Sequence, residues 1–140
     1  MFDAVWALLS TMRHAMFGIW AEVDLTPPMA MALKELGEGS MPQGSLAHCL
    51  GYDPSSITGL ADRLESRGLV ERQVDPNDRR IKRLAISPTG RALLDDVHDR
   101  LRHRLPVALR LDDAEQQALV RLLHKAVGDD EPVVRAGLRG

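Results

Sequence analysis

The chain has 140 residues, of which 44% are hydrophobic, 27% charged and 4% aromatic, which favours one globular domain with a modest core over two independent domains. Eighteen Lys and Arg residues against twenty Asp and Glu residues give a net charge of −2, which excludes a uniformly basic coat protein but allows a local basic patch. Cys49 is the only cysteine, so an intramolecular disulfide and a cysteine-rich zinc module are excluded. The sequence shows no secretory signal and no apolar run of membrane-spanning length, so we expect a cytoplasmic protein with no membrane partner.

The first predicted element is a long helix over residues 2–23. An apolar stripe of about six turns is too large for a domain of this size to cover easily. It therefore predicts either contact with a second subunit or packing against the C-terminal helices, and the sequence leaves both alternatives open. The stripe follows a 3-4-3-4 spacing that is typical of a helix, through Phe2, Val5, Leu9, Met12, Met16, Ile19 and Val23.

Three short helices are predicted next, over residues 27–36, 42–50 and 54–67, because prolines open them and glycines close them. Thr26 and Asp53 are the expected N-caps of the first and third. The second and third helices flank a tight turn, which is the outline of a helix-turn-helix.

Two segments with β-compatible apolar positions, 69–74 and 81–86, are separated by a polar turn and predict a β-hairpin. Ser87 and Pro88 then supply a cap and a first-turn proline for another helix. Its apolar residues Leu94, Val97, Leu101 and Leu105 share one face up to Pro106.

The last apolar helix begins at Asp112 or Asp113 and ends at Gly128. Residues 129–140 are expected to form a poorly ordered tail.

The hairpin follows the helix-turn-helix directly, which is the position of a wing. Residues 55–72 (SSITGLADRLESRGLVER), followed by DPNDRR at 75–80 and LAISPTG at 84–90, closely resemble the MarR family of bacterial winged-helix regulators. The three motifs occur in register, and the resemblance extends more loosely over residues 2–127.

The resemblance implies an α+β, mostly helical fold with a single domain over residues 1–128. It places a winged helix-turn-helix at 27–87, a linking helix at 88–105 and dimerisation helices at 2–23 and 107–128. The function that it implies is a homodimeric transcriptional regulator, in most cases a repressor released by an effector, that binds a pseudo-palindromic operator in double-stranded DNA.

The local charge agrees with this interpretation. Residues 67–83 carry six basic and three acidic side chains, a net charge of +3 within a chain of −2. Such a run alone would indicate an ordinary solvated hairpin. Beside the motifs above it favours contact with DNA phosphates.

In the wing, the resemblance makes Arg80 the candidate for insertion into the minor groove, whose negative potential attracts a guanidinium. Arg79 is then expected on phosphate, with Lys82 as a further contact. Asp78 is expected to orient an arginine, and a turn-forming aspartate is the alternative, compatible with the first.

On the predicted recognition helix, Ser55, Ser56 and Thr58 offer hydroxyls to phosphates or bases, with helix capping as the alternative for the two serines. Gly59 replaces the longer polar side chain of many relatives. Arg63 is expected either to reach DNA or to pair with Asp62 or Glu65. Two residues at the start of the preceding helix, Gln43 and Ser45, are expected to contact the DNA backbone.

An effector pocket for a small aromatic compound is predicted beside Trp6, His14 and Trp20, with core packing as the alternative for either tryptophan. The five histidines are scattered, so no metal site is expected. Cys49 is expected to be a buried, inert thiol, with redox sensing as the alternative.

No catalytic set or phosphate-binding loop is evident, so neither an enzyme nor a cofactor is expected. The competing class of function is a winged-helix module that binds protein and not DNA.

Overall fold

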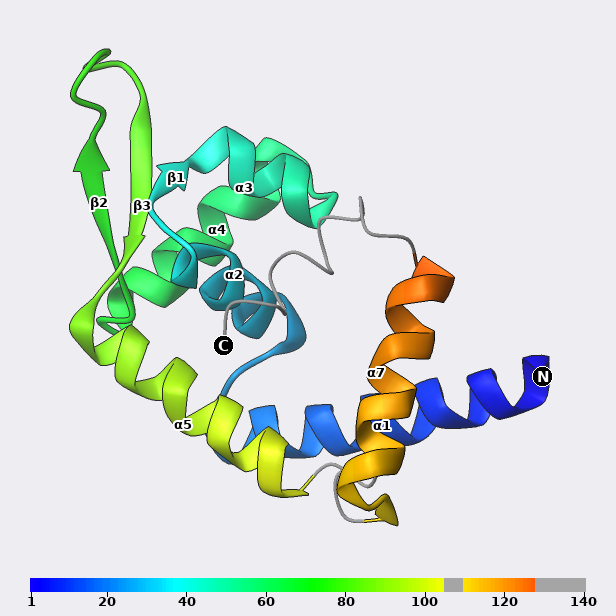
Figure 1. Ribbon diagram of the computed structural model, residues 1–140. Coiled ribbons are helices and arrows are strands. Elements are labelled where there is room, and N and C mark those ends of the chain that lie inside the picture. Colours follow the sequence, from blue (N-terminus) through cyan, green and yellow to red (C-terminus); the bar gives the residue numbers. More distant parts are fainter. Residues whose placement is uncertain (105–109, 128–140) are drawn as a thin grey trace. The chain divides into compact units, whose positions relative to one another are not determined.

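The computed structural model describes residues 1–104 and 110–127 (Figure 1). The chain forms two compact units, which are described separately: a terminal unit of Met1–Ala15 with the described residues from Arg102 onward, and a central unit of Met16–Leu101. The predictions for Leu105, Pro106, Gly128 and the tail at 129–140 lie outside the described residues.

Two long helices supply the terminal unit. Helix α1 spans Phe2–Glu22, as predicted, and continues into the central unit; helix α7 spans Asp113–Val127. Asp112 caps α7, since its carboxylate accepts from the Glu115 backbone N–H at 2.9 Å and the Glu115 carboxylate accepts from the Asp112 N–H at 3.0 Å. This reciprocal capping box explains the start of the helix.

The apolar stripe of α1 differs between its two ends. Phe2 and Leu9 are 77% and 57% exposed, whereas Ile19 is 2% exposed and belongs to the core of the central unit. An exposed apolar face is also present on α7, where Val120, Leu122 and Leu123 are at least 45% exposed. The described residues of the terminal unit therefore leave a large apolar surface uncovered.

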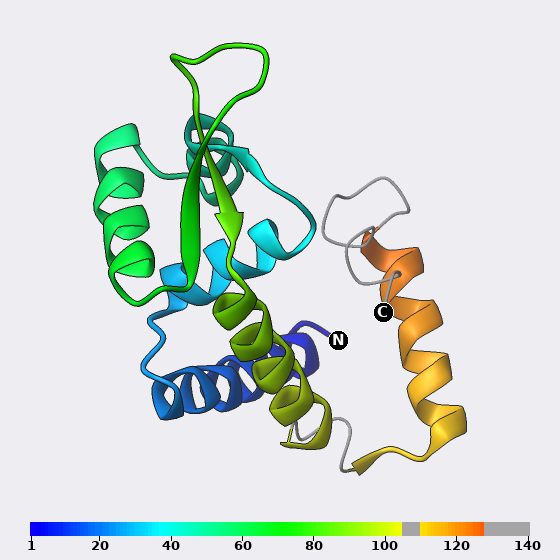
Figure 2. The ribbon, with the colours of Figure 1, turned by 90° about the vertical axis from the view of Figure 1, so that its left-hand side faces the viewer.

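The central unit contains the predicted helix-turn-helix and wing. Helices α2 (Pro27–Gly37), α3 (Gln43–Leu50) and α4 (Pro54–Ser66) precede strands β2 (Val70–Val74) and β3 (Lys82–Ile86), and α5 (Pro88–Arg104) follows. Strands β2 and β3 pair antiparallel, with Val70 opposite Ile86 and Val74 opposite Lys82. Figure 2 shows the tip of this hairpin projecting beyond α3 and α4, as expected of a wing.

A third strand was not predicted. Met41 and Pro42 form β1, which pairs with β3 and gives the sheet the order β1-β3-β2. The helix predicted to open at Pro42 begins one residue later, at Gln43, because Pro42 is its N-cap and also lies opposite Arg83 in the sheet. Proline is tolerated here because β1 is an edge strand.

Local signals explain the other helix boundaries. Asp53 caps α4 as predicted, and Ser87 caps α5 by accepting from the Gly90 N–H at 2.9 Å. Thr26 stands at the N-cap of α2, but its side chain makes no capping hydrogen bond, so that prediction is confirmed for position only. Only glycine fits at position 90, because an added Cβ would lie 2.0 Å from the Leu69 carbonyl oxygen.

The core of the central unit joins all these elements. The predicted inward residues of α4 are buried, and the fully buried side chains come from α2, α3, α4, β2 and β3: Leu33, Leu36, Leu46, Ile57, Leu64, Val70 and Leu84. Replacing one such leucine by alanine lowers the free energy of unfolding by about 2–5 kcal/mol. This core fixes the positions of α4 and the wing.

Cys49 is exposed, so the prediction of a buried thiol is wrong. Helix α3 buries Leu46 and Ala47, and Cys49 lies beside that face and not on it. A short amphipathic helix has few buried positions, and the cysteine does not occupy one of them.

Candidate nucleic-acid interface

A surface groove of about 770 Å³ lies between the start of α3, the exposed side of α4 and the wing, here defined as residues 70–86. The groove brings together five of the nine residues predicted to contact DNA: Gln43, Ser45, Thr58, Arg80 and Lys82. The other four, Ser55, Ser56, Arg63 and Arg79, do not line it. Its remaining lining residues were not predicted, and they are Pro42, Gly44, Arg72 and Ile81.

The first turn of α4 is organised by Asp53. Its carboxylate accepts from the Ser55 and Ser56 backbone N–H groups at 3.0 Å each and from both serine hydroxyls at 2.6 Å. Hydrogen bonds from the two serine side chains are the largest cause that holds the pKa of Asp53 far below its ordinary value. The helix cap is therefore Asp53, and the two serines bind that cap instead of acting as caps themselves.

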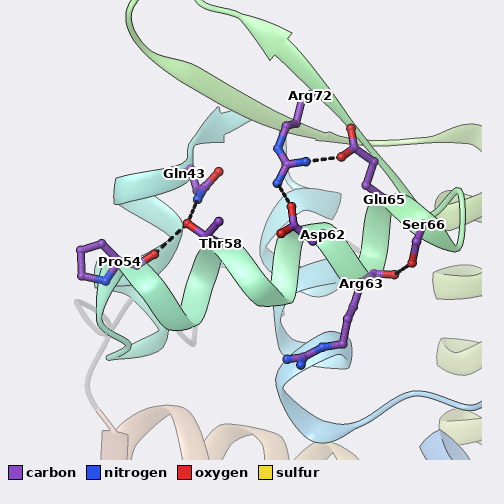
Figure 3. Close-up of polar contacts among 8 residues, drawn as sticks. All are labelled: Gln43, Pro54, Thr58, Asp62, Arg63, Glu65, Ser66 and Arg72. Atoms are coloured by element: carbon purple, nitrogen blue, oxygen red, sulfur yellow. Dashed lines mark hydrogen bonds and ion pairs between the residues drawn. The ribbon is translucent and has the colours of Figure 1, made fainter.

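Thr58 and Gln43 connect the two helices of the helix-turn-helix (Figure 3). The Thr58 hydroxyl donates to the Pro54 carbonyl at 3.0 Å and accepts from Gln43 Nε2 at 2.8 Å. Since the hydroxyl hydrogen is used within α4, Thr58 offers DNA only acceptor capacity in this arrangement. The Gln43 side chain is held by Thr58, which fixes how its amide is presented in the groove.

The acidic residues of α4 pair with a basic residue that was not predicted as their partner. Asp62 and Glu65 both accept hydrogen bonds from the guanidinium of Arg72, which reaches them from β2 (Figure 3). Hydrogen bonding to Asp62 is the first cause that raises the pKa of Arg72 above its ordinary value. The suggested pairing of Arg63 with these acids is not observed, and Figure 3 shows the Arg63 side chain leaving α4 away from Arg72.

Asp75 anchors the turn of the wing, directly after β2. The residue is buried, and its carboxylate accepts from the Asn77 N–H at 2.8 Å, the Asp78 N–H at 3.2 Å and Arg83 Nη1 at 3.0 Å. The Asn77 hydrogen bond, then the Arg83 bond, holds the pKa of Asp75 below its ordinary value. Arg83 also donates to the Ser40 carbonyl and thereby ties the wing to the segment before β1.

Asp78 has the second of its two predicted roles, that of a turn-forming residue. Its side chain accepts from the Arg80 backbone N–H at 2.9 Å, which is the bond of a turn-forming aspartate. The acid that pairs with an arginine in the wing is Asp75 and not Asp78. Within the described residues, no ion pair engages the side chains of Arg79, Arg80 or Lys82, and all three are exposed.

A second cavity, of about 380 Å³, lies inside the central unit. Trp20 is among its lining residues, together with Lys34 and His98, in an otherwise apolar wall formed by Met16, Leu25, Ala30, Met31, Leu33, Leu94, Val97 and Leu101. Trp6 and His14 do not line it, so of the three residues predicted beside the effector pocket only Trp20 faces this cavity. Trp6 stacks on Phe2 in the terminal unit instead.

The histidines are exposed or half-buried, and residues 1–104 and 110–127 contain no cluster of His, Cys, Asp and Glu suited to a metal ion. None of the helices in these ranges combines the length and apolar character needed to span a bilayer.

The order and packing of these elements define a winged helix-turn-helix protein. Comparison with known proteins agrees: residues 25–82 match the model of the MarR family. The chain is 33% identical over 101 residues to the transcriptional repressor NicR of Pseudomonas putida, a match that covers 71% of this chain and 63% of NicR.

Solved structures extend the similarity to nearly the whole chain. A probable transcriptional regulator from Pseudomonas aeruginosa is 31% identical, with a TM-score of 0.66, and the match covers 90% of this chain and 99% of that one. A MarR family protein from Bacillus stearothermophilus is 25% identical, with a TM-score of 0.79 and 89% of each chain covered. The chain belongs to the MarR family. It spans between about half and two thirds of the length of the curated relatives that head the comparison, 51% of one and 63% of NicR.

Proposed function

We propose that this chain is a sequence-specific regulator of transcription that binds double-stranded DNA in the cytoplasm, as a repressor, and that it is not an enzyme. The observation that carries the proposal is the groove that places Gln43, Ser45 and Thr58 opposite Arg80 and Lys82. A helix-turn-helix and a flanking cationic hairpin on one face match the geometry of a major groove beside a phosphate backbone. The names of the similar proteins, which are regulators and a repressor, support the same function.

In the proposed complex, α4 enters the major groove and the wing follows the adjacent backbone. Arg80 enters the minor groove, while Arg79 and Lys82 contact phosphates. Gln43 and Ser45 contact the backbone at the start of α3. Ser55, Ser56 and Arg63 lie outside the groove, so we assign them a secondary role at its edge.

The proposed active form is a homodimer that joins its terminal helices. The exposed apolar residues of α1 and α7, such as Leu9 and Leu122, supply the surface that a second copy would cover. A two-fold dimer then reads a pseudo-palindrome with half-sites about one helical turn, roughly 34–36 Å, apart.

The dimer is tested by Leu122→Asp, which places a charge on this apolar surface. Leu122 is 64% exposed in the single chain, so the fold of the chain should survive the change while the dimer is lost. Sedimentation velocity at micromolar concentration should show a wild-type dimer and a monomeric variant. A monomeric wild-type protein would refute the dimer.

The effector is proposed to be a small aromatic compound that binds the 380 Å³ cavity beside Trp20. To release DNA, the effector must bind more tightly to a conformation in which the spacing between the two recognition helices of the dimer does not match the DNA. A preference of about 1–3 kcal/mol for one conformation over the other is typical of such coupling. Titration of aromatic acids, followed by tryptophan fluorescence and DNA affinity together, tests the coupling. A fluorescence response without a change in affinity would overturn it.

The DNA-binding function is tested by measuring the affinity of the chain for an arbitrary duplex at increasing salt, then sequencing the genomic fragments that it retains. Binding that weakens steeply with salt, with enrichment of a palindromic sequence, is the expected result. A folded protein that binds no duplex even at low salt would instead indicate the protein-interaction module.

A further inference from the structure

The recognition helix carries its acidic side chains close to the proposed DNA surface. Helix α4 contains Asp62, Arg63 and Glu65 as its only ionisable residues, so its own sequence has a net charge of −1. The side chains of Asp62 and Glu65 are 59% and 40% exposed. Left alone, two carboxylates at this position would repel the phosphates that the helix must approach.

Arg72 offsets one of these two negative charges locally. Its guanidinium binds Asp62 through Nη2 and Glu65 through Nη1, so one planar fork holds both carboxylates (Figure 3). The Arg72 side chain is only 25% exposed, yet the residue lines the groove together with Arg80 and Lys82. Lysine cannot reproduce this arrangement because it presents a single ammonium point charge and not a rigid fork.

We propose that Arg72 is a positioning residue for DNA binding: it offsets one of the two negative charges of Asp62 and Glu65 and holds both carboxylates in place beside the groove. This inference rests on the proposed function. Arg72 acts through the two acids and not as a phosphate ligand, since two of its nitrogens are already engaged within the protein.

The test compares duplex affinity and its salt dependence for four proteins: the wild type, Arg72→Gln, Asp62→Asn/Glu65→Gln, and the triple variant that combines these changes. Arg72→Gln should bind about tenfold more weakly, because it exposes two carboxylates near the phosphates. The triple variant should return to within about threefold of wild-type affinity, with the wild-type salt slope. Asp62→Asn/Glu65→Gln should bind several-fold more tightly, because it leaves the Arg72 charge uncompensated.

A matched control neutralises two exposed acids elsewhere in the central unit. Glu38→Gln/Asp95→Asn changes the net charge by the same amount at residues that do not line the groove, and it should leave affinity nearly unchanged. An equal gain in both double variants would mean that only the total charge matters, which would overturn the proposal.

Two other outcomes would also contradict it. If the triple variant stays as weak as Arg72→Gln and its salt slope falls by about 0.9, Arg72 is a direct phosphate ligand. If it stays weak with an unchanged slope, Arg72 is only a structural clamp. If Arg72→Gln fails to fold, Asp62→Asn/Glu65→Gln still tests the proposal, since an affinity at or below that of the wild type excludes an electrostatic effect of the two acids.

Failure of the wild type to bind any duplex would instead refute the proposed function. This outcome distinguishes failure of the proposed function from failure of the inference about Arg72.

Discussion

Helix α4 and the wing face the same groove but differ in how their polar side chains are used. On α4 the hydroxyls of Ser55, Ser56 and Thr58 donate within the protein, and the two acids are held by Arg72. The wing carries five basic and three acidic side chains between Val70 and Ile86, and within the described residues Arg79, Arg80 and Lys82 have no ion-pair partner. Helix α4 therefore provides a fixed shape, whereas the wing provides free charge.

The largest expected loss of duplex affinity follows from removing an arginine of the wing, compared with removing an arginine of α4. Arg80→Ala should weaken duplex binding about tenfold or more, because an exposed cation at the groove is removed. Arg63→Ala removes the same group from α4 outside the groove and should cost less than about threefold. Fluorescence anisotropy with a labelled duplex at fixed salt measures both. Equal losses would remove the distinction between the two elements.

A smaller effect is expected where the wing is anchored. Asp75→Ala removes the acceptor of the Asn77 and Asp78 amides and the partner of Arg83. The freed turn must then be ordered upon binding, which should lower duplex affinity roughly fivefold. Hydrogen exchange at the two amides should accelerate. Asp75→Asn, which keeps one carbonyl acceptor, is the matched control and should lose less affinity; unaltered exchange in Asp75→Ala would disprove the anchoring role.

The two anchoring carboxylates also predict an acid dependence of stability. The pKa values of Asp53 and Asp75 lie below their ordinary value of 3.8 in the folded protein. Their stabilisation is therefore complete above that value and is lost as the pH falls below it toward the folded pKa values. The melting temperature of the wild type should fall between about pH 4 and pH 2 more than that of Asp53→Asn/Asp75→Asn. Parallel declines would show that other groups cause the acid effect.

The smallest effect is expected at Gly59 on α4. An added Cβ there meets no atom within 4 Å, so alanine fits without a clash. Gly59→Ala should stabilise the protein by up to about 1 kcal/mol, because alanine loses less backbone entropy in a helix. The melting temperature should rise and the duplex affinity should stay the same. A clear loss of affinity would show that DNA approaches the bare backbone at this position, and α4 would then be more than a fixed shape.

Sequence patterns predicted those features that depend on neighbouring residues. Asp53 with Pro54 and Ser87 with Pro88 set helix starts through contacts within four residues, and both caps are observed. The predicted hairpin over 69–74 and 81–86 is likewise observed as the antiparallel pair β2 and β3. Local signals of this kind do not depend on the rest of the fold.

Features that depend on distant residues were missed. Strand β1 has two residues and exists only because β3 lies beside it, with Met41 opposite Leu84. Closeness in sequence suggested Arg63 as a partner of Asp62 or Glu65, whereas the partner, Arg72, comes from the following strand. Trp6, His14 and Trp20 were predicted beside one pocket, whereas only Trp20 lines the cavity of the central unit.

The central claim, that free charge on the wing drives DNA binding, is tested most directly by the salt dependence of duplex affinity. Wild type and Arg79→Ala/Arg80→Ala/Lys82→Ala should be compared in a plot of log affinity against log salt concentration. If each cation neutralises one phosphate, the slope should become shallower by about 2.7 for each subunit bound. A slope that does not change would contradict the account and place the electrostatic contacts elsewhere on the protein.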